Sequence, residues 1–369
     1  MSKPMHDLLQ GMNLAYNTGL KARERYELAQ KSHNRSLPAP CDAVRLWHLV
    51  AHDWLLQSNK RFWVALGHAN YPAALLALKD PPLILFGEGN ATLLNTPGIA
   101  MVGSRNASRT GLGTAHGFAR EFTRRGWTVI SGLAEGIDGA AHTGALEARG
   151  NTIAVLGCGP DEIYPKHHAG LKARIIQEGG LVLSEYPPGT APQPGFFPRR
   201  NRIIAGLSDG LLVVEAALRS GSLITARVAS ELGRPVGAIP GSIHSSQSKG
   251  CHAMIKKGAL LVETAQELLD EAAATLPEYK TPFNPSLLQE EHTHCDDEFE
   301  RAPTPHAGLD TSLKAVLDSL GHEPVHVDAL AGQLGFSTED TVAALVELEL
   351  LGLTLGEAGN RWVRSNGVF

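Results

Sequence analysis

From residue 98 onward, short hydrophobic runs alternate with amphipathic segments along the chain. The runs are rich in Val, Ile and Leu, which is typical of buried strands. We expect strands at Ile99–Val102, Thr128–Ser131, Thr152–Leu156, Leu181–Ser184, Gly210–Val214 and Pro235–Ile239. The helices expected between them are Thr110–Arg125, Gly136–Ala148, His168–Glu178, Pro198–Leu207 and Ser222–Leu232. This alternation predicts an α/β fold: a doubly wound, mainly parallel sheet with a ligand crevice at the carboxyl ends of its strands.

The segments that flank this core follow other patterns. Residues 1–90 have the pattern of a helical domain, interrupted near its end by a short strand at Leu83–Phe86. The core itself spans residues 91–276 and is closed by a helix over Thr264–Leu276. Residues 277–309 are rich in proline and acidic residues and lack periodicity, so we expect a linker there.

Residues 310–369 contain three short amphipathic helices and then a hairpin with strands at Leu353–Leu355 and Arg361–Val363. This is the arrangement of a winged helix-turn-helix domain, whose third helix often reads DNA. Here the third helix, which begins after Ser337, carries several acidic residues and no lysine or arginine. Because phosphates would repel such a helix, we interpret the domain as a docking or stabilising module.

Composition narrows the class of protein. With 369 residues, 43% of them hydrophobic, the chain has the profile of a soluble protein of two or three domains. No apolar run reaches the length of a membrane span and no signal-peptide core is present, so we expect no membrane association. The four cysteines are far apart, which favours a reducing cytoplasm. We assign the cluster His292, His294, Cys295 and Asp296 to a solvated part of the linker and expect no metal site.

The net charge of −5 hides a strong segregation of charge along the chain. Residues 96–263 carry 18 lysines and arginines against 12 acidic residues, a balance of +6. Residues 264–369 carry 5 against 19, a balance of −14. A polyanion is therefore a plausible partner for the middle of the chain only.

Candidate binding chemistry is concentrated in Phe196-Phe-Pro-Arg-Arg-Asn-Arg-Ile-Ile204. Proline suits the first turn of a helix, so we expect a helix to begin at Pro198 and to aim its arginines at an anion such as phosphate. The neighbouring phenylalanines offer flat surfaces on which unpaired bases could stack. The residues assigned to binding here are Phe197, Arg199, Arg200, Asn201 and Arg202. The alternative is that the phenylalanines belong to the core and the arginines cover a solvated helix face.

Small residues follow four of the predicted strands, where the backbone can approach a ligand closely. They are Gly103 and Ser104 with Arg105 after the first strand, Ser131 and Gly132 after the second, Gly157 and Gly159 with Lys166 after the third, and Ser220, Gly221 and Ser222 after the fifth. A single such turn would more often be an ordinary helix entry. Because strand ends meet at one edge of a parallel sheet, the four together indicate one continuous crevice that completes the site predicted for Phe196–Ile204.

The same region lacks the signatures of catalysis and of a cofactor. The glycine pattern around Gly111 has the wrong spacing and position for a dinucleotide fingerprint, so we expect no NAD site and no cofactor. Asp138 and His142 lie one helical turn apart, but no activated nucleophile accompanies them, and we expect a mutual contact that fixes the helix. Glu215 is also a weak catalytic candidate, because no activated nucleophile accompanies it. We therefore assign no catalytic residue.

These residues resemble the DNA-processing protein A family (DprA, also called Smf). The matching motifs are Val102-Gly-Ser-Arg105, Ser131-Gly-Leu-Ala-Glu-Gly-Ile-Asp138, Ala154-Val-Leu-Gly-Cys-Gly159 with Tyr164-Pro165, Ser184-Glu-Tyr-Pro187, Phe197-Pro-Arg-Arg-Asn-Arg-Ile-Ile204, Val214-Glu-Ala216, Ser220-Gly-Ser-Leu-Ile-Thr225 and Ile239-Pro-Gly241. The resemblance implies an extended Rossmann core between a helical, SAM-like N-terminal domain and a C-terminal winged helix.

The resemblance also implies a function. The core would bind single-stranded DNA without cleaving it, as a cytoplasmic homodimer that loads the RecA recombinase during natural transformation. Arg105 and the arginines of Pro198–Arg202 would line a phosphate pocket, with Phe197 near the bases. The chain departs from the family at His168, where an asparagine is usual, and the histidine could add mild pH sensitivity.

A second hypothesis comes from another class of protein. Related Rossmann folds cleave the glycosidic bonds of nucleotides with a glycine-rich loop followed by a glutamate. The loop Ser220-Gly-Ser-Leu223 lacks that glycine pattern, and Ala226–Ala229 offers no acid in the next turn. The binding protein is therefore our preferred interpretation and the nucleotide-directed glycosidic hydrolase the alternative.

Overall fold

The computed structural model describes residues 3–16, 40–276, 311–321, 324–350, 353–357 and 359–364. Within them the chain divides into a large unit, which holds nearly everything up to Leu276, and a small C-terminal unit. The linker predicted at residues 277–309, with its His292–Asp296 cluster, lies outside the described residues.

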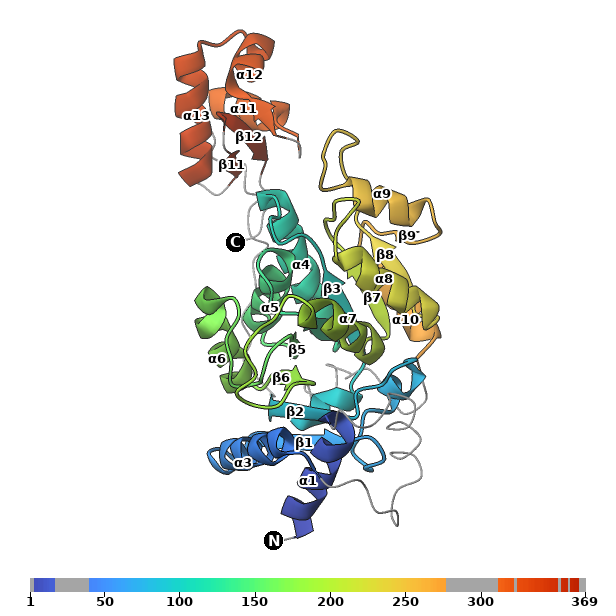
Figure 1. Cartoon of the computed structure of the whole chain (residues 1–369). Helices are drawn as coiled ribbons and strands as arrows, with labels where there is room; N and C mark the ends of the chain where they lie inside the picture. Colours follow the sequence, from blue (N-terminus) through green and yellow to red (C-terminus); the bar gives the residue numbers. More distant parts are fainter. Residues whose placement is uncertain are drawn as a thin grey trace, which may run out of the picture. The chain divides into compact units, whose positions relative to one another are not determined.

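A nine-stranded sheet runs through the large unit in the order β1-β2-β6-β5-β4-β3-β7-β8-β9 (Figure 1). Its strands are β1 (Arg61–Ala65), β2 (Ile84–Gly89), β3 (Gly98–Val102), β4 (Thr128–Ser131), β5 (Thr152–Leu156), β6 (Leu181–Ser184), β7 (Gly210–Val213), β8 (Val236–Ala238) and β9 (Leu260–Leu261). The strands from β6 to β9 pair in parallel, whereas β1 and β2 pair antiparallel at one edge. The predicted α/β fold with a mostly parallel, doubly wound sheet is confirmed.

The helices of this unit include the five predicted between the core strands and the predicted closing helix, in the predicted order. They are α1 (Lys3–Tyr16), α3 (Asp42–Leu56), α4 (Arg109–Arg124), α5 (Ile137–Glu147), α6 (Ala169–Gln177), α7 (Phe196–Leu207), α8 (Ser222–Glu231), α9 (Lys249–Ile255) and α10 (Ala265–Ala274), with short 3-10 turns η1 (Ala73–Ala77), η2 (Ala91–Asn95) and η3 (Lys166–His168). Thr264 and Glu267 cap α10 reciprocally, as a capping box requires.

Residues of a single strand pack into the cores on both faces of the sheet, as a doubly wound fold requires. Ala100 and Val102 of β3 pack into the same core as residues of α7 and α8. Ile99 and Met101, whose side chains point the opposite way, pack with residues of α4, α5 and α10. This alternation follows from the two-residue period of a strand, and it explains why the strands read as continuous hydrophobic runs.

The structure differs from the sequence prediction at both edges of the sheet. The stretch Arg61–Ala65, expected within a helical region, is strand β1, and it pairs with β2. Its aromatic and β-branched residues favour a strand, but the run is short and only half-buried. The edge strand β9 and helix α9 were also missed. The limits 1–90 and 91–276 remain predictions, although β1 and β2 join the same sheet as the core.

The C-terminal unit has the predicted three helices and hairpin. It contains α11 (Thr311–Ser319), β10 (Val325–His326), α12 (Val327–Leu334), α13 (Thr338–Leu350), β11 (Thr354–Glu357) and β12 (Arg361–Arg364), and β12 lies between β10 and β11. Its own core includes Val316, Leu330, Leu345 and Trp362. The Ser337 hydroxyl accepts a hydrogen bond from the backbone N–H of Asp340 (3.0 Å) at the start of α13. None of the helices described for the whole chain is long and apolar enough to cross a bilayer.

Candidate nucleic-acid interface

The centre of the sheet contains a topological switch point. From β3 the chain continues through β4, β5 and β6 on one side, and β7, β8 and β9 lie on the other. Ligands of open α/β sheets bind at such a point, beyond the carboxyl ends of the strands. Here the loops that follow β3 and β7 are joined by two hydrogen bonds. The Ser104 N–H donates to the Glu215 carbonyl (2.7 Å), and the Ser222 hydroxyl donates to the Gly103 carbonyl (2.7 Å).

A pocket of about 590 Å³ opens at this point. We call it the strand-end pocket. Of the predicted binding residues, those that line it are Gly103, Ser104, Arg105, Phe197, Arg200, Asn201, Ser220, Gly221 and Ser222. Glycine is required at position 103, because a Cβ there would lie 2.4 Å from the Ile137 side chain. Of the four strand-end turns predicted to form one crevice, those after β3 and β7 line this pocket, together with α7.

Arg105 and Phe197 form a cation–π pair at this pocket. The Arg105 guanidinium carbon lies 5.5 Å from the centre of the Phe197 ring, and Arg105 is exposed. Tyr164 extends the aromatic surface, with its ring centre 5.1 Å from that of Phe197. An exposed cation beside two flat rings can contact a phosphate and an unpaired base at the same time.

Helix α7 begins two residues earlier than predicted, at Phe196, and it divides the predicted cluster between two faces. Phe197, Arg200 and Asn201 line the strand-end pocket, whereas Phe196, Arg199 and Arg202 do not. Consecutive residues of a helix point about 100° apart, so positions three or four apart, such as Phe197 with Arg200 and Asn201, share a face. Of the three arginines expected at one phosphate pocket, only Arg200 lines the strand-end pocket, and the assignment of Arg199 and Arg202 to DNA binding stays a prediction.

Arg200 is a buried residue with structural contacts. Only 3% of its surface is exposed. Its Nη1 donates to the Gly132 carbonyl (2.7 Å) and to the Val155 carbonyl, and its Nε donates to Asn201 Oδ1 (3.2 Å). Burial lowers the pKa of this guanidinium, and the charge of Asp138 partly opposes that shift. Arg200 therefore joins β4 and β5 to α7, and Nη1 is already used by the backbone.

Arg202 and Arg199 face an acidic residue after β6. Arg202 Nη2 lies 2.5 Å from Glu185 Oε1, and both side chains are largely buried. Arg199 Nε lies 3.5 Å from Glu185 Oε2, but the Arg199 side chain is 55% exposed. The sequence patterns did not reveal this pairing, because Glu185 belongs to the loop after a distant strand.

The remaining predicted residues do not line the strand-end pocket, but two of the glycines shape it. A Cβ at Gly132 would lie 2.5 Å from the Arg200 guanidinium, and a Cβ at Gly157 would lie 2.8 Å from the Phe197 ring. Ser131 is buried and donates to the Met101 carbonyl (2.7 Å). Gly159 packs close to Asp161, and Lys166 is exposed on η3. Glycine at 132 and 157 is thus needed for room beside α7, not for direct approach to a ligand.

Asp138 and His142 have separate partners, contrary to the expected mutual contact. Asp138 Oδ2 accepts hydrogen bonds from the N–H groups of Gly132 (3.1 Å) and Ala134 (3.4 Å). Burial raises the pKa of Asp138, while the cation of Arg200 lowers it. His142 Nδ1 lies 2.7 Å from Thr152 Oγ1. Burial lowers the pKa of His142 to about 3, so the ring is neutral at physiological pH.

His168, the departure from the family motif, is half-buried and lies outside the strand-end pocket. Its Nδ1 is 3.0 Å from the Leu133 carbonyl. Its effect on the site is therefore indirect, through the loop after β4.

Among the residues that line the strand-end pocket but were not assigned to it from the sequence are Tyr164, Arg219 and Gln247. Arg219 is exposed and directly precedes the Ser220 turn, so its charge next to that motif was a usable signal. Tyr164 stands in a recognised motif, but only the fold brings it to Phe197. Gln247 comes from a loop with no distinguishing pattern.

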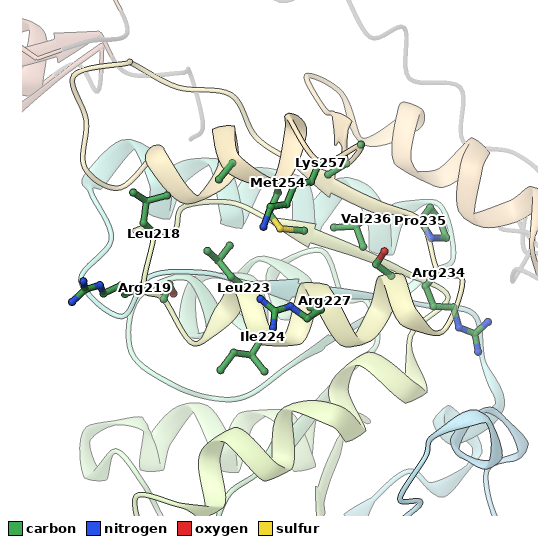
Figure 2. Close-up of a pocket in the computed structure, with 15 residues that line it drawn as sticks. Leu218, Arg219, Leu223, Ile224, Arg227, Arg234, Pro235, Val236, Met254 and Lys257 are labelled. Carbon is green, nitrogen blue, oxygen red and sulfur yellow. The ribbon is translucent and has the colours of Figure 1, made fainter.

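A second groove of about 610 Å³ lies between α8 and α9 and shares Arg219 and Ser220 with the strand-end pocket. Figure 2 shows Ile224 and Arg227 on α8, with Met254 on α9 and Lys257 just after it. None of the residues lining this groove is acidic. Leu218 and Ile224 are 63% and 48% exposed. This face thus combines cations with uncovered apolar side chains.

The chain is similar to known proteins over both of its units. The family model for DNA recombination-mediator protein A matches residues 62–273, and that for the DprA winged helix domain matches residues 300–360. The chain is 41% identical to Protein Smf of Escherichia coli K12, over 81% of this chain and 76% of that protein. It is 48% identical to DNA processing protein DprA of Streptococcus pneumoniae R6, over 54% of this chain and 71% of that protein.

Two solved structures resemble this fold. One is the X-ray structure of DNA processing protein A from Streptococcus pneumoniae, with a TM-score of 0.60 and 38% identity, covering 73% of this chain and 98% of that chain. The other is DNA processing protein A from Helicobacter pylori, a structure that describes a single-stranded DNA binding mode, with a TM-score of 0.52 and 32% identity over 57% of this chain and 96% of that chain. The chain therefore belongs to the DNA recombination-mediator protein A family, the family of the DprA and Smf proteins.

Proposed function

We propose that this protein binds single-stranded DNA at the strand-end pocket and processes DNA in transformation without cutting it. The observation that carries the proposal is the pair formed by exposed Arg105 and the Phe197 ring, 5.5 Å apart, at the switch point of the sheet. An arginine fork suits a phosphate, and an adjacent ring suits an unpaired base whatever its sequence. The relative from Helicobacter pylori, which binds single-stranded DNA, supports this choice of ligand.

We propose that the protein is not an enzyme. His142 is buried against Thr152, is neutral and does not line the strand-end pocket. Asp138 does line it, but its Oδ2 is used by the N–H groups of Gly132 and Ala134, which favours a structural role for this carboxylate. The alternative, a nucleotide-directed glycosidic hydrolase, would release free base from nucleoside monophosphates. Chromatography of such incubations separates the two functions: base release by the wild type that is lost in Glu215→Gln would favour the hydrolase.

We further propose that the protein acts in the cytoplasm as a homodimer and loads RecA onto the bound strand. The exposed Leu218 and Ile224 beside the groove of Figure 2 suit a protein surface better than a polyanion. Sedimentation of the wild type and Ile224→Glu tests self-association. The rate at which RecA assembles on DNA coated with a single-strand binding protein tests loading.

The central experiment measures the affinity for a labelled oligothymidine at two salt concentrations. Arg105→Ala is expected to lower the affinity about tenfold, since a phosphate contact is lost. It should also lower the slope of log affinity against log salt by about 0.7, the value for one phosphate of a single strand.

Arg174→Ala is the matched control, because Arg174 is a partly exposed arginine on α6 that pairs with Glu178. It removes the same charge from a place outside the pocket and should leave both quantities nearly unchanged. Equal affinity of the wild type and a folded Arg105→Ala would refute the assignment of this site.

A further inference from the structure

A third and larger pocket lies on the other side of α7 from the strand-end pocket. Its volume is about 1120 Å³, and it is formed by α1, α3, the segment Lys79–Ile84 that leads into β2, the loop after β6 and α7. Figure 1 shows α1 and α3 at the β1–β2 edge of the sheet. We call it the aromatic pocket, because Tyr16, Trp47, Tyr186 and Phe196 all line it.

The aromatic side chains are arranged as two pairs of rings. Tyr186 and Phe196 are stacked, with ring centres 4.1 Å apart and planes inclined by 22°. Tyr16 and Trp47 meet edge to face, with ring centres 5.6 Å apart. Tyr16 is fixed in place by its hydroxyl, which donates to the Glu185 carbonyl (2.6 Å). Trp47 keeps 37% of its surface exposed, so it has area left for a further flat group.

The charges of the aromatic pocket suit a phosphate near its rim. Two acidic residues line the pocket, buried Glu185 and exposed Asp80, and Arg202 pairs with both: its Nη2 lies 2.5 Å from Glu185 Oε1 and 3.7 Å from Asp80 Oδ2. Arg199 is held only loosely, since its Nε lies 3.5 Å from Glu185 Oε2 and its side chain is 55% exposed. Glu185 is buried and keeps Arg202, while the Arg199 guanidinium lies on the exposed side of a long pair, so a phosphate can contact Arg199 without leaving Glu185 unpaired.

Phe196 and Phe197 connect the two pockets. They are consecutive residues of α7, so their Cα atoms are about 3.8 Å apart while their side chains point about 100° apart. Phe197 belongs to the strand-end pocket and Phe196 to the aromatic pocket. A strand that places one base against Phe197 can therefore pass over the start of α7 and present a later base to the second site.

We propose that the aromatic pocket is a second base-stacking site for the same strand, with Arg199 as its phosphate contact. The ligand is an unpaired nucleobase with its phosphate, taken without preference for sequence because stacking uses the face common to all bases. This inference rests on the proposed function and adds a second site to it.

Oligothymidines of graded length test the proposal. Trp47→Ala should leave the affinity for an oligomer of about four nucleotides unchanged, since that length fills only the strand-end pocket. It should lower the affinity for one of about twelve nucleotides roughly tenfold, as expected for one lost stacking contact. Its salt slope should stay that of the wild type, whereas Arg199→Ala should reduce the slope for the long oligomer only. Leu46→Ala is the control, because Leu46 is 62% exposed on the same helix and does not line the pocket.

Quenching of tryptophan fluorescence gives an independent measurement. The long oligomer should quench the wild type more than Trp47→Phe, and the short oligomer should quench both equally. Equal affinities of Trp47→Ala and the wild type at every length would overturn the second site while leaving the proposed function intact. If thymidine monophosphate quenched Trp47 while the affinity for oligothymidines did not depend on their length, the aromatic pocket would bind single nucleotides and not the strand, which would overturn the proposal. Failure of the wild type to bind any oligomer would instead refute the proposed function.

Discussion

Replacement of Arg200 by alanine should destabilise the large unit by about 3–5 kcal/mol. Arg200 is 3% exposed, and its removal takes a hydrogen-bond donor away from the buried Gly132 and Val155 carbonyls. Each unsatisfied buried carbonyl costs about 1–3 kcal/mol. The carboxylate of Asp138 also loses the cation that lowers its pKa, and breaking a buried charge pair costs a similar total, about 3–5 kcal/mol.

Urea denaturation followed by circular dichroism measures this loss, and thermal melting should show a fall of about 6–20 °C for a unit of this size. Arg199→Ala is the control on the same helix: its side chain is 55% exposed, so its stability should change by about 0.5 kcal/mol or less. A loss below about 1 kcal/mol in Arg200→Ala would refute the reasoning, because it would mean that water or a rearranged side chain satisfies both carbonyls. If Arg200→Ala lost DNA binding but kept full stability, Arg200 would instead be a phosphate contact, as the sequence predicted.

Further predictions concern binding, pH and the C-terminal domain. Phe197→Ala should cost about 1–3 kcal/mol of oligothymidine binding without changing the salt slope, and Phe197→Tyr should restore it; lost stability that tyrosine does not rescue would assign Phe197 to the core. The pKa of His142 is about 3 in the folded protein against 6.5 ordinarily, so the unfolded state gains a proton first as the pH falls. The contribution of His142 to the free energy of unfolding is therefore complete above pH 6.5 and is lost towards pH 3, by about 2 kcal/mol at pH 5. In denaturation experiments at several pH values, His142→Gln should lose less stability than the wild type as the pH falls. Parallel pH profiles for the two proteins would contradict this prediction. Deleting residues 311–369 should change oligothymidine affinity by less than about tenfold, since α13 has acidic residues and no lysine or arginine; a larger fall would show that the winged helix holds DNA.

Much of the fold could be predicted because its signals are local. The core strands are buried on both faces, so each appears in the sequence as an uninterrupted apolar run, and the predicted limits agree with the structure to within one residue. The capping box of Thr264 and Glu267 is likewise a matter of spacing. Strand β1 was missed because a short, half-buried strand has no pattern that separates it from its surroundings until β2 pairs with it.

The composition of the candidate site was also largely present in the sequence, as glycines, serines and arginines after the strands. What only the tertiary structure decided is which way each side chain points. Helix α7 turns by about 100° at every residue, so its arginines are divided among the interior, Glu185 and the solvent. Burial then gives the same residue type different roles. Arg105 remains exposed beside Phe197, where it can meet a ligand, while Arg200 is enclosed by backbone carbonyls that must be satisfied. A sequence specifies which charges a helix carries, but the partners of those charges come from strands far away in the chain and exist only once the sheet has formed.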